Sequence, residues 1–144
     1  IGTDPPGDKN HGRLTARDPI TGKLAWEKRY DLIPHSTLMS TGSDLLFVGT
    51  ADGFVEALDA RNGEVLWKYN VGSGVHGGII SYAVDGKQYV AVLSGVGGWF
   101  GAIVSLDLPP DDPFGALGEV GVAYQSGLDK ATTKGGMLYV FALD

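Results

Sequence analysis

The sequence contains no cysteine, and only 19% of its 144 residues are charged. Without cysteine the chain can form neither a disulfide nor a thiolate metal site. No apolar run approaches the roughly 20 residues of a membrane-spanning helix, and the first residues show no signal-peptide pattern. The formal net charge of −6 disfavours nucleic acid and anionic membrane surfaces as partners.

Histidine is also scarce, with one residue each at positions 11, 35 and 76. His11, His35 and His76 lie far apart in the sequence, and none is followed by a second ligand two to four positions later, so the pattern does not indicate a metal site. We expect ordinary loop or surface histidines. No Ser-His-Asp set and no carboxylate pair can be assigned either. We therefore name no catalytic residue and no metal ligand in this chain.

Glycine and apolar residues are abundant. The chain has 23 glycines and is 43% hydrophobic. The glycines follow no three-residue period, which excludes collagen, and the content of Val, Tyr, Phe and Trp argues against disorder. The length favours one domain. These features together predict a globular, all-β chain.

One stretch occurs twice, at residues 16–26 and 57–67. The shared positions are Ala16, Asp18, Gly22 and Trp26, which recur 41 positions later as Ala57, Asp59, Gly63 and Trp67. A sequence period near 40 is typical of stacked or radial repeats.

Each copy of the stretch predicts a hairpin that ends on a tryptophan. In the second copy, residues 54–58 and 66–71 have strand-like patterns. Between them, Asp59 can hydrogen-bond the turn backbone, and Asn62-Gly63 tolerates positive φ. A buried indole N–H needs a partner, so we interpret the two tryptophans as joints between neighbouring repeats. The alternative is two unrelated hairpins, each with its own core tryptophan.

The other predicted strands group with the repeats into propeller blades. Residues 37–40, 45–50, 54–58 and 65–71 predict four consecutive antiparallel strands, which make one propeller blade. A hairpin over residues 79–93 and a last strand at 137–143 follow. Residues 95–136 are predicted to be a long loop or insertion within the last blade, and no helix is signalled. About two to three blades are present.

Two or three blades cannot close a ring, and an open stack leaves strand edges unpaired. We therefore expect further blades, in the same or a separate chain, to complete the structure.

The repeated motif, A-x-D-x-x-x-G-x-x-x-W, resembles the tryptophan-docking motif of the quinoprotein alcohol dehydrogenases. The likeness continues through residues 72–77, 85–99 and 132–143. The whole run is similar to the C-terminal part of a methanol dehydrogenase, nearer the lanthanide-dependent branch than the calcium-dependent one. This resemblance implies that residues 1–144 are C-terminal blades of an eight-bladed β-propeller. It also places Trp26 against the Asn62-Gly63 turn of the next repeat.

The resemblance further implies a periplasmic, homodimeric enzyme that contains pyrroloquinoline quinone (PQQ) and a lanthanide or calcium ion. Such an enzyme oxidises a primary alcohol, for example methanol, to the aldehyde and passes electrons to a c-type cytochrome. The family's catalytic Asp, its metal ligands and its vicinal cysteine pair belong to earlier parts of the chain. We therefore expect this chain to be inactive alone. The alternative is a non-catalytic propeller that serves as an interaction scaffold.

Two glycine-rich loops are candidates for ligand contact. Residues 72–77 match G-x-G-x-x-G, but the nucleotide-binding fingerprint needs a helix after it and β-type sequence follows. We predict an inter-blade crossing near the propeller axis instead. The second loop contains Gly97, Gly98 and Trp99, and the resembling enzymes bring a Gly-Gly-Trp stretch close to the quinone. We expect Trp99 to face the cofactor rather than to serve only as core packing.

Positions 34 and 35 depart from the family pattern. The chain has Pro34-His35 where the resembling enzymes often place a tryptophan near the quinone.

Overall fold

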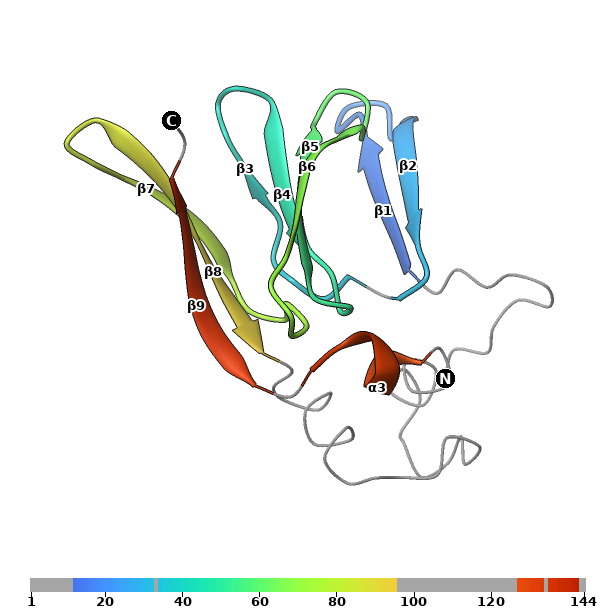
Figure 1. Cartoon of the computed structure of the whole chain (residues 1–144). Helices are drawn as coiled ribbons and strands as arrows, with labels where there is room; N and C mark the ends of the chain where they lie inside the picture. Colours follow the sequence, from blue (N-terminus) through green and yellow to red (C-terminus); the bar gives the residue numbers. More distant parts are fainter. Residues whose placement is uncertain (1–11, 33, 96–126, 134, 143–144) are drawn as a thin grey trace.

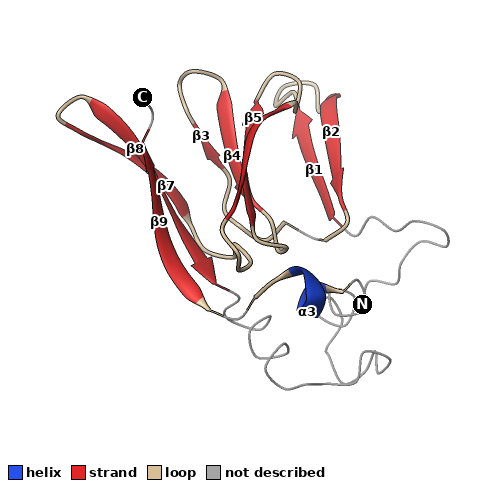
Figure 2. Cartoon of the chain, viewed as in Figure 1, coloured by secondary structure: helices blue, strands red, loops and turns tan. Residues whose placement is uncertain are grey.

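Three antiparallel β-sheets stand side by side in the computed structural model, which describes residues 12–32, 34–95, 127–133 and 135–142 (Figure 1). The strand order within each sheet follows the chain: β1-β2, then β3-β4-β5-β6, then β7-β8-β9 (Figure 2). Within the described ranges, no helix is long and apolar enough to cross a membrane. The predicted all-β class is confirmed.

The first sheet is the hairpin of the first repeat, in which β1 (Gly12–Arg17) pairs with β2 (Leu24–Tyr30). Ala16 lies opposite Trp26, and the register shifts directly after Ala16. In the second repeat Ala57 lies opposite Trp67, with the same shift after it. The sequence repeat is therefore also a repeat of strand register.

The two repeat turns are built alike. The carboxylates of Asp18 and Asp59 accept backbone N–H groups of their own turns at 2.8–2.9 Å. The N–H groups of Gly22 and Gly63 each donate to the aspartate carbonyl at 2.8 Å. Both glycines have positive φ, +69° and +77°, a region that side chains with a Cβ rarely adopt. This explains why Asp and Gly recur at these positions.

The second sheet is the predicted four-stranded blade. It consists of β3 (Met39–Ser40), β4 (Leu45–Gly49), β5 (Phe54–Asp59) and β6 (Val65–Asn70). Each strand pairs antiparallel with the next. β5 is almost wholly buried, whereas β6 is exposed along its length, so the sheet is packed at its centre and open at its last strand.

The third sheet contains β7 (Ile79–Val84), β8 (Lys87–Gly95) and β9 (Gly136–Ala142). All three strands were predicted. The structure adds a single helical turn, α3 (Leu128–Ala131), which begins after Gly127 at φ +83°. One turn contains too few residues to show a helical period in the sequence. The predicted loop at residues 95–136 lies mostly outside the described residues.

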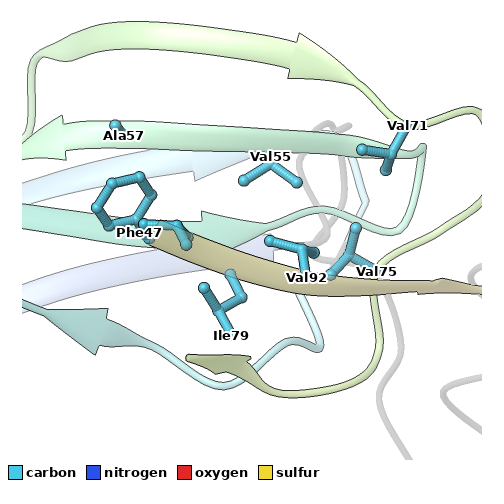
Figure 3. Close-up of a cluster of buried hydrophobic side chains, with 8 residues drawn as sticks. Phe47, Val55, Ala57, Val71, Val75, Ile79 and Val92 are labelled. Atoms are coloured by element: carbon cyan, nitrogen blue, oxygen red, sulfur yellow. The ribbon is translucent and has the colours of Figure 1, made fainter. Parts of the chain in front are cut away.

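The largest core cluster lies between the second and third sheets (Figure 3). Its buried members are Phe47, Val55, Ala57, Val71, Val75, Ile79, Val90 and Val92. On β7 and β8 the side chains alternate between the two faces of the sheet. Ile79 and Val92 therefore enter this core, whereas Ile80 and Leu93 are 59% and 55% exposed on the opposite face. A smaller cluster joins the first and second sheets through Leu14, Val48 and Leu58.

Trp26 locks the first sheet to the second. Its indole N–H donates to the carbonyl of Ala60 at 2.8 Å. A Cβ added to Gly63 would lie 2.7 Å from the indole carbon Cε3, so the ring rests directly on the glycine. This confirms the predicted position of Trp26. Trp67, the equivalent residue, meets the edge of Phe141 at 5.0 Å between ring centroids and stays 37% exposed.

A buried carboxylate also joins the first two sheets. Glu56 of β5 is 3% exposed, and it accepts a hydrogen bond from the Tyr30 hydroxyl at 3.0 Å. The ammonium groups of Lys28 and Lys68 lie 3.8 Å and 3.1 Å from its two oxygens. Burial, followed by the charge of Glu56, raises the pKa of Tyr30. The carboxylate of Glu56 therefore links its own strand, β5, to side chains of β2 and β6.

Candidate functional site

The connection from β6 to β7, residues 71–78, is the crossing between the second and third sheets. In Figure 1 it lies at the lower end of the sheets, on the side where α3 lies. The N–H of Val71 donates to the Gly53 carbonyl at 2.8 Å, and that of Val75 to the Thr50 carbonyl at 3.0 Å. The crossing is therefore bonded to the β4–β5 turn along its length.

The end of β8 is bonded to the same crossing. The hydroxyl of Ser94, which is 1% exposed, donates to the carbonyls of Val71 and Ser73 at 3.2 Å and 2.9 Å. Val75 and Gly95 form an isolated parallel bridge. β8 therefore ends on the crossing, directly before the predicted Gly97–Trp99 contact, whose residues lie outside the described part of the chain.

Gly74 is the most constrained residue of the crossing. A Cβ at this position would lie 2.5 Å from the carbonyl oxygen of Ala51, so no larger residue fits without displacing backbone. Its carbonyl accepts the N–H of Gly95 at 2.8 Å. Its N–H donates to the hydroxyl of Thr132 at 2.6 Å in a buried contact.

The segment that follows α3 lies on the crossing as well. Thr133 donates to the Gly72 carbonyl twice, from its N–H at 3.1 Å and from its hydroxyl at 3.0 Å. Leu128 is 1% exposed and Thr132 is 8% exposed, so this segment is packed as part of the structure.

His35 and His76 meet at this end. Their ring centroids are 5.7 Å apart, with the rings tilted by 49°. Burial, followed by the charge of His35, lowers the pKa of His76 from 6.5 to about 4, so its imidazole is neutral at pH 7. We expected isolated histidines. The signal that could have found the pair is their spacing of 41 positions, the same as the period of the tryptophan repeat.

The structure allows a check of the sequence-predicted sites. Residues 72–77 lead into strand β7 and not into a helix, so the inter-blade crossing is confirmed and the nucleotide-binding alternative is excluded. Gly97, Gly98 and Trp99 lie outside the described residues, and their role remains a prediction. Among the described residues, no three His, Asp or Glu side chains are grouped to hold a metal ion.

Comparison with known proteins identifies related sequences. The family model for PQQ, "Glucose/ethanol/alcohol dehydrogenase, beta-propeller domain", matches residues 5–90. The lanthanide-dependent methanol dehydrogenase of Methylacidiphilum fumariolicum (strain SolV) is 51% identical over 95% of this chain and 23% of that protein. Subunit 1 of the methanol dehydrogenase [cytochrome c] of Paracoccus denitrificans is 41% identical, over 92% of this chain and 20% of that protein.

A solved structure agrees with these matches. A europium-containing methanol dehydrogenase superposes with a TM-score of 0.87 at 51% identity, over 95% of this chain and 24% of that one. The chain thus spans about a fifth to a quarter of the length of these relatives. Its three sheets correspond to part of a β-propeller.

Proposed function

Because this chain belongs to the family of PQQ-dependent methanol and alcohol dehydrogenases, we propose that it forms part of an enzyme that oxidises a small primary alcohol, such as methanol, to the aldehyde. One observation carries the proposal: 51% identity over 95% of the chain, matched by a TM-score of 0.87 to a methanol dehydrogenase structure. A match over 95% of the chain includes the loops as well as the strands. Binding and catalytic residues are most often located on loops.

The chemistry divides between this chain and the rest of the protein. When bound, PQQ would accept the two electrons and two protons that leave the alcohol, and a lanthanide or calcium ion would supply Lewis acidity beside it. The described residues offer close backbone approach at the crossing and a neutral imidazole at His76, but no group of metal ligands. They fit one wall of a cofactor chamber whose base and metal ligands come from other blades.

Within that wall, Gly97, Gly98 and Trp99 are the proposed cofactor contacts. Gly95, two positions earlier in the sequence, is held on the crossing by its bond to Gly74 and its bridge to Val75. Glycine permits close backbone approach, and an indole offers a flat face to a planar quinone. The same family membership supports a c-type cytochrome as electron acceptor, a periplasmic location and a homodimer.

The first test is the activity of the separate part. Residues 1–144 supplied with PQQ and metal are expected to show no dye-linked alcohol oxidation, because the sequence offers no assignable general base and the described residues contain no group of metal ligands. The same chain within the complete propeller is expected to be active and to show quinone absorbance. Oxidation by residues 1–144 alone would refute this division of roles, and a complete protein that binds no quinone would favour the scaffold alternative.

The second test concerns Trp99 in the complete enzyme. Trp99→Ala is expected to weaken quinone retention by roughly tenfold or more, the usual effect of losing a well-packed aromatic contact. Trp99→Phe should restore most of the retention. Trp67→Phe is the matched control, because it alters a tryptophan at a blade joint and should lower Tm without changing retention. Unchanged PQQ affinity after Trp99→Ala would show that the contact is not made.

A further inference from the structure

One residue of the crossing binds both sides of the segment that separates β8 from α3. The carbonyl of Gly74 accepts the N–H of Gly95, the last residue of β8, at 2.8 Å. Its N–H donates to the hydroxyl of Thr132, directly after α3, at 2.6 Å. Gly95 and Thr132 are 37 positions apart in the sequence, yet both are hydrogen-bonded to the backbone of Gly74.

We propose that Gly74 and Thr132 are positioning residues for the cofactor contact. The two bonds from Gly74, to Gly95 and to Thr132, are called here the Gly74 tie. The tie holds the two described flanks, Gly95 and Thr132, on the crossing, and Gly95 lies two positions before the first proposed cofactor contact in the sequence. The inference rests on the proposed function, since those three residues are its cofactor contacts.

The chemistry of the tie favours this role over general packing. Thr132 is 8% exposed and its hydrogen bond to Gly74 is buried, so neither group can form a replacement hydrogen bond with water if the other is removed. No side chain can be accommodated at Gly74, because a Cβ would lie 2.5 Å from the Ala51 carbonyl oxygen. A short bond between a locked backbone N–H and a buried hydroxyl is a rigid link, which is what positioning requires.

The structure also shows a second support on each side. Gly95 faces Gly136 in the β8–β9 ladder, where a Cβ on Gly95 would lie 3.1 Å from the Gly135 carbonyl. Thr133 adds two bonds to the Gly72 carbonyl. With these supports in place, loss of the Thr132 hydroxyl is expected to loosen the tie without unfolding the sheets.

The test uses the complete PQQ-loaded enzyme and the substitution Thr132→Val, which keeps the shape and removes the hydroxyl. The expected result is a rate of quinone loss that rises roughly 5- to 30-fold, the range that follows from losing one buried hydrogen bond. Thr132→Ser, which restores the hydroxyl, should return the rate toward that of the unaltered enzyme.

The control is Thr41→Val, which removes a hydroxyl that accepts the Leu45 N–H at 3.3 Å in the β3–β4 turn. It should lower Tm and leave quinone loss unchanged, because a merely structural effect would move only Tm. Hydrogen exchange at the Gly74 amide gives a readout that does not depend on PQQ. The amide should be strongly protected in the unaltered enzyme and exchange faster in Thr132→Val.

The outcomes separate the two proposals. If Trp99→Ala speeds quinone loss and Thr132→Val does not, the positioning role is wrong and the proposed contact stands. If neither substitution changes quinone loss, the contact itself is wrong and the positioning role falls with it. Should Thr132→Val not fold, rapid exchange of the Gly74 amide in the unaltered enzyme would still overturn the inference.

Discussion

The substitution Gly63→Ala probes the joint between the first two sheets. Gly63 lies beneath the indole of Trp26, in a turn where its φ is +77°. An added Cβ would lie 2.7 Å, 2.9 Å and 3.1 Å from three carbons of that ring. An indole is rigid, and its N–H is bonded to Ala60 at 2.8 Å, so the ring cannot move aside without losing that bond.

Two costs add in this variant. Forcing a residue with a Cβ into the left-handed region costs about 1–2 kcal/mol. Inserting a methyl group into a packed contact costs about 1–3 kcal/mol more. Gly86→Ala is the matched control, because Gly86 has φ +78° and no described atom within 4 Å of the added Cβ. It should therefore show the first cost alone.

The assay is thermal unfolding of both variants and of the unaltered chain. A domain of this size shifts its Tm by roughly 2–4 °C for each kcal/mol. Gly63→Ala is therefore expected to unfold about 2–12 °C below Gly86→Ala. In a Trp26→Phe background the difference should shrink, because the smaller ring leaves room for the methyl group. Equal Tm values for the two glycine variants would refute the docking of Trp26 on Gly63.

Three further predictions concern the buried carboxylate, its tyrosine partner and a partly buried histidine. Glu56→Gln should destabilise the chain by about 2 kcal/mol in urea unfolding, less than the 3–5 expected for a wholly buried pair because its lysine partners are partly exposed. Tyr30→Phe should cost about 1.5–3 kcal/mol unless Glu56 is already replaced, and full additivity of the two would show that the hydrogen bond contributes nothing. The folded-state pKa of His76, about 4, lies below the ordinary 6.5. The stability that comes from keeping this imidazole neutral is therefore fully present above pH 6.5 and is lost as pH falls toward 4. Discounted for the exposed part of the ring, the loss is roughly 1–2 kcal/mol, and His76→Gln should abolish it; an unchanged pH profile in that variant would contradict the assignment.

Local patterns predicted most of the fold. The strands of the second and third sheets were found from apolar runs, alternation and Asp-Gly or Asn-Gly turns, because each hairpin contains its own signals. The position of Trp26 followed from the resemblance that the repeat motif carries. These are features in which the residues that specify a structure lie next to one another or recur at a fixed period.

The connections at the crossing were not predicted, for a physical reason. The Gly74–Thr132 bond joins residues 58 positions apart. The sequence around a glycine or a threonine does not indicate which distant residue its N–H or hydroxyl will bond. The single turn of α3 is too short to show a period. The His35–His76 pair did leave a trace, its spacing of 41 positions, but two histidines without further ligands resemble loop residues.

Trp26 and Trp67 occupy the same position of the same motif, end equivalent hairpins and face alanines across the same register. Among the described residues, however, Trp26 rests on a turn glycine and donates its N–H to a carbonyl, whereas Trp67 meets Phe141 edge-on and is 37% exposed. Since the two hairpins are alike, the difference arises from what each indole meets. The stability of a joint therefore depends on the pair formed by the indole and the turn of the next repeat. The hairpin positions the tryptophan ring at the joint, and the glycine turn of the next repeat supplies the contact and the hydrogen-bond acceptor that bury and fix the ring.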